Sequence, residues 1–156
     1  MRIGRLEVEV SGSRIVLAGR IDDSATALGD LLTHVPPGDV VLDTSSVTFI
    51  NSIGMREWMR LVRAFRERGK VTFERVADVL ITQMNVIPEF KGIDVASFHA
   101  QYLCPSCGVE GTPLIDVATH VAELRAMRAP KMPCPECGAA MDLADFPERY
   151  LSLFRT

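Results

Sequence analysis

The sequence predicts an α/β protein in which a mixed sheet of four to five strands is covered by helices and followed by a small cysteine-rich module. Three observations predict this fold class. A continuous apolar run, Val40–Leu42, precedes an amphipathic helix that ends at Gly69, and this order is half of a strand–helix–strand unit. Alternating apolar residues mark two strands before it. Two cysteine pairs follow it, so we expect one part over residues 1–100 and another over 101–156.

Composition and charge are typical of a globular chain and exclude several function classes. Hydrophobic residues make up 47% and charged residues 24% of the sequence, which excludes a disordered protein. The net charge of −3 argues against a general affinity for nucleic acid. No secretion signal is visible, and no apolar run approaches the roughly 18 residues of a membrane span. We therefore expect a cytoplasmic protein whose cysteines are reduced or metal-bound.

The first forty residues predict a hairpin and a helix. Apolar and charged residues alternate over 5–10, and apolar residues continue the pattern over 15–21, with a Ser-Gly-Ser turn between them. These two strands should pair antiparallel. Asp22–Ser24 offers N-caps for a helix, which a Pro-Pro-Gly segment ends before the central strand at Val40.

The central segment carries the clearest helical pattern. A polar loop is expected after Leu42, followed by a second apolar pair, Phe49–Ile50. The helix beyond it has two faces. Its apolar face, expected in the core, carries Met55, Trp58, Met59, Val62 and Phe65. Its opposite face carries Arg56, Arg60 and Arg63. These arginines are either a solvated face or a patch for an acidic partner.

A polar turn, Asn51–Gly54, begins this helix and leaves unpaired backbone N–H groups, which suits binding or regulation. The surrounding run, from Val40 to Gly69, resembles the core of STAS domains, the sulphate-transporter and anti-sigma-factor-antagonist family. That family has an apolar strand, an Asp, a V-x-F-I/M run, then Asp-Ser-Ser/Thr-Gly-Leu and a helix ending in Gly. The matching positions are Asp43, Val47, Phe49, Ile50, Ser52, Gly54 and Gly69.

The resemblance extends more weakly over residues 1–100 and implies a STAS-like fold and a non-enzymatic regulatory role. STAS domains of this kind dock to protein partners, such as anti-sigma factors with a kinase-type fold, and phosphorylation releases them. The implied partner surface is the turn with the exposed helix face after it. It comprises Asn51, Ser52, Ile53, Gly54, Arg56, Arg60 and Arg63.

Two departures from the family pattern bear on regulation. Asn51 replaces the usual Asp, and Ile53 replaces the Ser or Thr that a partner kinase phosphorylates. Because isoleucine has no hydroxyl, this phosphorylation cannot occur at residue 53. Ser52 is the only local substitute, but helix geometry turns it about 100° away. The simpler interpretation is that Asn51 or Ser52 caps the helix. If the resemblance holds, a protein without this switch would be constitutive or controlled by other means.

Beyond Gly69, the pattern predicts a strand over 71–76, a short helix over 77–85 and a last strand over 93–98. A terminal helix over 145–154 is also expected, capped by Asp145 with an apolar face that includes Phe146. That face either packs on the main domain or forms an oligomer contact.

A Cys-Pro-x-Cys-Gly sequence occurs twice and is the strongest chemical signal in the chain. In each copy the two thiolates lie on one side of a tight turn, which glycine permits. Together they supply four sulfur ligands, the full tetrahedral shell of structural zinc, with Zn–S bonds of about 2.3 Å. The predicted ligands are Cys104, Cys107, Cys134 and Cys137. A closed shell of four cysteines is structural rather than catalytic, and residues 101–143 resemble zinc-ribbon domains.

Other interpretations of the cysteines are weaker. A redox dithiol is disfavoured by the duplication and by the glycine after each pair, and structural disulfides by the absence of a secretion signal. The inner cysteines, Cys107 and Cys134, are further apart than the usual spacing of about 15–20 residues. An extra helix, capped by Asp116 with Val117, Val121 and Leu124 on one face, accounts for the difference.

Three rival functions stay open. The domain could sense a small molecule or nucleotide in a crevice near Asn51–Gly54. The cysteine module could bind nucleic acid through Arg125, Arg128 and Lys131, although residues 100–156 carry five basic against seven acidic side chains. An enzyme is the least supported class, because no Ser-His, Cys-His or paired-carboxylate pattern is visible.

Overall fold

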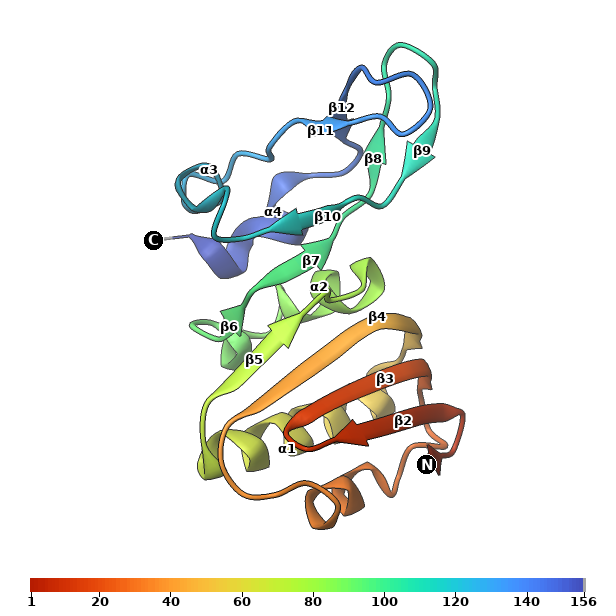
Figure 1. Cartoon of the computed structure of the whole chain (residues 1–156), viewed down its shortest axis with the longest axis vertical. Helices are drawn as coiled ribbons and strands as arrows, with labels where there is room; N and C mark the ends of the chain where they lie inside the picture. Colours follow the sequence, from red (N-terminus) through yellow and green to blue (C-terminus); the bar gives the residue numbers. More distant parts are fainter. Residues whose placement is uncertain (156) are drawn as a thin grey trace.

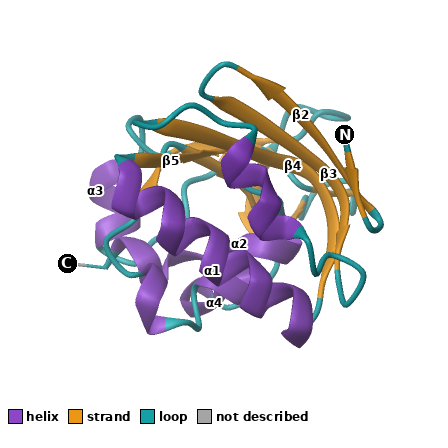
Figure 2. Cartoon of the chain, turned by 90° about the horizontal axis from the view of Figure 1, so that it is seen from below, coloured by secondary structure: helices purple, strands orange, loops and turns teal. Residues whose placement is uncertain are grey.

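A six-stranded sheet with helices on one face dominates the computed structural model, which describes residues 1–155 (Figure 1, Figure 2). In spatial order its strands are β1 (Arg2–Ile3), β2 (Leu6–Ser11), β3 (Arg14–Ile21), β4 (Val40–Ile50), β5 (Val71–Glu74) and β6 (Asp94–Val95). β2 pairs antiparallel with both β1 and β3. From β3 to β6, neighbouring strands pair in parallel. This confirms a mixed α/β architecture. The sheet exceeds the predicted four to five strands because β1, a strand of two residues that was not predicted, extends one edge.

The predicted hairpin is β2 and β3, in antiparallel register with Val8 opposite Leu17. Gly12, at the turn, has φ +60°, a conformation that glycine adopts readily. Leu6 and Val8 are buried while the intervening Glu7 is exposed, because successive side chains of a strand point to opposite faces. One face of the hairpin therefore enters the core.

β4 runs without interruption from Val40 to Ile50, so the polar loop expected after Leu42 is wrong. Strand β3 pairs alongside the polar stretch, with Ala18 opposite Ser46. Backbone hydrogen bonds to a neighbouring strand do not depend on side-chain polarity. The exposed side chains of Ser46 and Thr48 need no apolar partner, so the strand continues to the turn at Asn51.

The helical layer contains η1 (Leu28–Thr33), α1 (Ser52–Arg68), α2 (Asp78–Met84) and η2 (Pro88–Phe90). Helix α1 buries the predicted apolar face against the sheet: Trp58 and Phe65 are inaccessible to solvent, whereas Met59 is half-buried. The Trp58 ring meets Phe73 of β5 edge-on, with centroids 6.1 Å apart. The predicted faces of this helix are confirmed.

The helix expected directly after Asp22 starts later and has a different form. It is the 3-10 helix η1, with Ala27 at the N-cap position and no side-chain capping bond. Asp22 does not cap it because its carboxylate accepts hydrogen bonds from Ser24, Arg5 and Arg20 instead. The predicted N-cap is therefore wrong, and the Asp22–Ser24 segment is a separate turn at the end of β3.

The predicted last strand over 93–98 is divided in two. β6 stays in the main sheet, whereas β7 (Ser97–His99) pairs antiparallel with β10 (Leu114–Asp116). A four-stranded sheet follows, made of β8 (Tyr102–Leu103), β9 (Glu110–Gly111), β11 (Met132–Pro133) and β12 (Ala140–Leu143). Residues 1–100, the sheet half, are therefore joined to residues 101–155, the cysteine half, by strand pairing as well as by the chain.

The terminal segment forms α4 (Pro147–Leu151) and η3 (Ser152–Phe154). These helices pack on the sheet half, which was the first of the two predicted alternatives. The Phe154 ring stacks on Phe98 at 5.3 Å between centroids. The Asn85 side chain donates to the Tyr150 carbonyl at 3.1 Å and accepts from the Leu153 N–H at 2.8 Å. Both polar atoms of the Asn85 side chain therefore connect α2 to the terminal segment.

Two details of the predicted terminal helix are wrong. Phe146 is 73% exposed, because it occupies the N-cap position before Pro147 in an extended conformation that points it away from the packed face. Asp145 therefore lies one residue before the cap. Its carboxylate accepts a hydrogen bond from the Phe146 N–H and pairs with Arg149.

The helix expected after Asp116 is shorter and begins later. Asp116 belongs to β10, and its carboxylate accepts hydrogen bonds from the N–H and hydroxyl of Thr119. That turn precedes α3 (Val121–Arg125), which starts after His120, so Asp116 is not its cap. Leu124 is buried as expected, but Val121 is 40% exposed. None of the helices in residues 1–155 is both long enough and apolar enough to cross a membrane.

Candidate metal centre and partner-binding surface

The two cysteine loops have the same local structure. In the first, the Cys104 N–H donates to the Val109 carbonyl, and the Gly108 N–H donates to the Cys104 carbonyl, both at 2.9 Å. The second loop repeats both bonds. Gly108 and Gly138 have φ of +76° and +77°, a region that strongly favours glycine. The glycine after each cysteine pair thus closes a turn that presents both sulfurs on one side.

The two cysteine loops lie side by side at the end of the molecule furthest from β2 and β3 (Figure 1). All four Sγ atoms lie within 4.8 Å of one another. Cys104 and Cys137 are 3.5 Å apart at Sγ, and Cys107 and Cys134 are 3.7 Å apart. A disulfide requires about 2.05 Å, so these sulfurs are not bonded to each other. A tetrahedral shell with bonds of about 2.3 Å needs sulfurs roughly 3.8 Å apart. The predicted cysteines could therefore hold one metal ion.

The ionisation of the cysteine thiols bears on whether the cluster could hold a cation. The Cys107 N–H, donating to Cys104 Sγ, lowers the pKa of the Cys104 thiol to about 7. The Val109 N–H acts in the same direction on Cys107, but burial and the neighbouring thiols outweigh it and raise the pKa of Cys107 to about 12. The Cys104 thiolate forms readily, whereas the raised pKa values of Cys107 and Cys137 oppose ionisation of those two thiols. Ionising all four requires a positive charge among them.

Tyr102 helps to bring the two loops together. Its side chain is buried, and the hydroxyl donates to the Pro130 carbonyl at 2.7 Å, across 28 residues of sequence. Burial raises the pKa of this hydroxyl well above its ordinary value. The pairing of β8 with β12, in which Leu103 lies opposite Asp142, then fixes the second loop beside the first. The ligand positions are thus held by backbone pairing and one buried hydrogen bond.

The start of α1 is held rigidly by two residues of the predicted turn. Asn51 Oδ1 accepts a hydrogen bond from the Gly54 N–H at 2.9 Å, so Asn51 rather than Ser52 caps the helix. Gly54 is buried against the end of β3, where a Cβ atom would lie 1.7 Å from the Ile21 carbonyl oxygen. Only glycine allows this approach. Ser52 is exposed, and Ile53 exposes 47% of its surface.

The predicted arginines lie on the outer face of α1. Arg56, Arg60 and Arg63 are all exposed. Arg60 pairs with Glu57 at 3.2 Å, and Arg63 pairs with Glu89 at 2.5 Å. The structure therefore brings the predicted surface residues onto one helix start and one helix face, with the exception of Gly54. Gly54 lies beneath this surface and supports it.

Sequence reasoning missed the role of Asp43, which has no accessible surface in the middle of β4. Arg14 Nη2 donates to its Oδ2 at 3.1 Å, and Arg75 Nε donates to the same oxygen at 2.9 Å. Burial raises the pKa of Asp43, but hydrogen bonds from Arg75 and from Ser45 outweigh it and leave the pKa below its ordinary value. Both arginines are distant in sequence, so no local pattern reveals the cluster.

Arg75 also connects this buried carboxylate to the cysteine half. Arg75 has φ +48°, in the left-handed region that residues other than glycine rarely adopt. Its backbone N–H donates to Ser97 Oγ at 2.9 Å. Ser97 begins β7, the strand that pairs with β10. The Asp43 cluster therefore reaches the junction between the two halves.

Neither a scan against models of known protein families nor a search of curated proteins finds a match to this chain. The function proposed below therefore rests on the residues and their geometry.

Proposed function

We propose that this protein is a non-enzymatic regulatory module that binds a protein partner through the start and outer face of α1. The observation that carries the proposal is the position of Ile53. It is a large apolar side chain, 47% exposed, on a helix start that Asn51 and Gly54 hold in place. Exposed arginines follow it on the same helix. An apolar anchor beside positive charge suits a partner that presents an apolar hollow with carboxylates around it.

The two kinds of residue contribute differently to binding. A side chain such as Ile53 contributes roughly 1.5–3 kcal/mol when a partner buries it fully. Exposed charge pairs contribute about 0.2–1 kcal/mol each, so Arg56, Arg60 and Arg63 mainly set approach and orientation. Two of these arginines already have acidic neighbours. We therefore assign most of the binding energy to Ile53.

The resemblance to STAS domains is supported by the order of elements around this turn. β4 leads directly into α1, and the turn lies at the C-terminal end of a parallel strand, where open α/β sheets present their binding sites. By that resemblance the partner is an anti-sigma factor or another kinase-like regulator. The usual phosphorylation switch is absent, because Ile53 takes the place of the Ser or Thr.

We also propose that the four cysteines hold one zinc ion as a structural centre of a zinc-ribbon module. An all-sulfur tetrahedral site is typical of zinc, and the closed shell leaves no position for a substrate. Bound zinc would supply the positive charge that four thiolates require. In this proposal Cys104, Cys107, Cys134 and Cys137 are ligands, and the metal takes no part in catalysis.

Substitution of Ile53 tests the partner surface. The parent chain is used to capture its partner, and calorimetric titration then compares Ile53→Asp, Arg60→Ala and a control, Val86→Asp. Val86 is also an exposed apolar residue, at 69%, but it lies in the loop after α2. We expect Ile53→Asp to weaken binding by about tenfold or more. Arg60→Ala should weaken it mildly and reduce its dependence on salt. Val86→Asp should bind like the parent.

If Ile53→Asp remains folded and binds like the parent, the interface lies elsewhere. The phosphorylation claim has its own measurement, the intact mass of protein from its native host. We expect no stoichiometric species heavier by about 80 Da, the mass of one phosphoryl group. A phosphopeptide containing Ser52 at high occupancy would contradict this claim without affecting the partner surface.

A further inference from the structure

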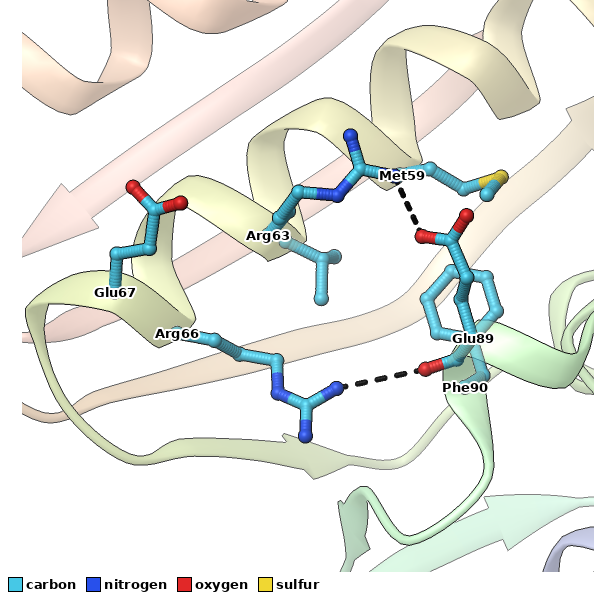
Figure 3. A pocket seen from close by; sticks show the side chains of 7 residues that line it. Met59, Arg63, Arg66, Glu67, Glu89 and Phe90 are labelled. Atoms are coloured by element: carbon cyan, nitrogen blue, oxygen red, sulfur yellow. Dashed lines mark hydrogen bonds and ion pairs between the residues drawn. The ribbon is translucent and has the colours of Figure 1, made fainter.

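A hollow of about 310 Å³ lies between the C-terminal half of α1 and η2, away from the predicted turn (Figure 3). Apolar and charged side chains line it in nearly equal number. The lining residues are Met59, Val62, Arg63, Arg66, Glu67, Glu89 and Phe90. Val62 and Phe90 are buried core residues, so the floor of the hollow is apolar and firmly packed. Its size is at the lower end of the range for small-molecule sites.

Two guanidinium groups of α1 reach across this hollow toward Glu89, one to its carboxylate and one to its carbonyl oxygen (Figure 3). Arg63 Nη2 donates to the Glu89 carboxylate at 2.5 Å. Arg66 Nη1 lies 3.5 Å from the Glu89 carbonyl oxygen, which is too long for a strong hydrogen bond. Arg66 is therefore a weakly engaged cation beside an apolar floor. The contact with Glu89 shows that Arg63 pairs with a carboxylate in this hollow.

We infer that this hollow binds a small organic acid with one carboxylate and an apolar tail. The carboxylate pairs with Arg66 and, in competition with Glu89, with Arg63. The tail lies on Val62 and Phe90, and the half-buried Met59 adjusts to its shape. This inference goes beyond the proposed function and does not depend on it, because no predicted partner residue except Arg63 lines the hollow.

The charges around the hollow restrict the class of ligand. Two arginines and two glutamates line it, so the site has no excess positive charge. A polyphosphate or nucleotide would bring several negative charges against Glu67 and Glu89, whereas a single carboxylate replaces only one. A neutral molecule would leave Arg66 without a stronger partner. A single carboxylate is therefore the best-matched head group, and an aliphatic chain fits the floor.

The test compares hexanoate with hexanol, which share a six-carbon chain but differ in charge. Each is titrated into the whole ¹⁵N-labelled protein, and amide chemical shifts are followed. We expect saturable shifts from hexanoate at residues 59–67 and 89–90, and much weaker binding of hexanol. Arg66→Gln should weaken hexanoate binding by about tenfold or more, because a charge-assisted hydrogen bond is lost. Arg60→Gln is the matched control: it removes the same charge from the same helix outside the hollow and should bind like the parent.

Glu89→Gln sharpens the test, because it removes the internal competitor and should tighten hexanoate binding by up to about fivefold. Spectra of each variant without ligand check that the fold is intact. Equal binding of hexanoate and hexanol would overturn the inference, and so would unchanged binding in Arg66→Gln. Absence of saturable shifts in these two segments would also overturn it.

Discussion

The two halves of this chain are stabilised by different means. The sheet half contains an 11-residue strand and a 17-residue helix that bury large side chains such as Trp58 and Phe73. In the cysteine half, β8, β9, β11 and β12 have two to four residues each, and α3 has five. Two of its few buried residues are the cysteines Cys104 and Cys134. Elements this short bury little apolar surface, and the proposed zinc ion would supply a cross-link between them.

The junction between the halves combines both kinds of stabilisation. Phe98 and Phe154 stack on each other, and Asn85 hydrogen-bonds the backbone of the terminal segment. At the start of β7, the Ser97 hydroxyl oxygen accepts a hydrogen bond from the Arg75 N–H. The terminal segment therefore belongs to the core of the sheet half, although it follows the cysteines in sequence. This difference predicts which changes unfold one half and which unfold both.

Loss of the metal should have the largest effect. Cys→Ser at Cys104, Cys107, Cys134 or Cys137 should unfold the cysteine loops while the main sheet stays folded. Elemental analysis of protein purified without added metal should give one zinc per chain, and NMR spectra should show which amides lose their native shifts. Ser106→Ala, in the same loop, is the control and should keep the metal. A zinc content near zero with all four thiols oxidised would contradict the metal centre.

Gly54→Ala should strongly destabilise the sheet half. The new Cβ would lie 1.7 Å from the Ile21 carbonyl oxygen, so α1 must move away from the end of β3. We expect a loss of about 3 kcal/mol in the free energy of unfolding, at the upper end for an overpacked site. Denaturant unfolding followed by the fluorescence of the single tryptophan, Trp58, measures it. The control is Gly29→Ala, where no atom lies within 4 Å of the added Cβ. Equal stability of the two variants would refute the close contact.

Acid should weaken the sheet half through Asp43. Its pKa is lowered from its ordinary value in the folded protein. A carboxylate with a depressed folded pKa stabilises the fold above its unfolded pKa, and this contribution is lost as pH falls through the folded pKa. Asp43→Asn should cost about 1–2 kcal/mol at pH 7, since both arginines are partly exposed. The difference from the parent should shrink as the pH falls below about 3.9, the ordinary pKa of an aspartate. Unfolding curves of both proteins over this pH range, followed by Trp58 fluorescence, check the sign.

Removal of the helix cap should have the smallest of these effects. Asn51→Ala deletes the acceptor for the Gly54 N–H and should cost about 1 kcal/mol. Asn51→Asp keeps an acceptor at the same position and should be close to the parent in stability. Denaturant unfolding of the three proteins gives the comparison. An Asn51→Ala variant as stable as the parent would show that the cap contributes nothing.

The sequence by itself determined the features that depend on neighbouring residues. The alternation in β2 and β3, the two faces of α1, the Asn51 cap and the repeated cysteine loops all follow from spacings of five residues or fewer. Such patterns reflect local backbone geometry, in which the period of a strand or helix and the turn that glycine permits are set within one element. For this reason the four candidate metal ligands could be named in advance.

Only the tertiary structure decided features that join distant residues. The polar part of β4 is a strand because β3 lies beside it. The buried carboxylate of Asp43 is paired with Arg14 of β3 and with Arg75, which follows β5. The hollow beside α1 exists because η2 brings Glu89 opposite Arg63, 26 residues away in sequence. The free energies of these contacts depend on which elements meet in space, and periodicity within one element carries no information about that.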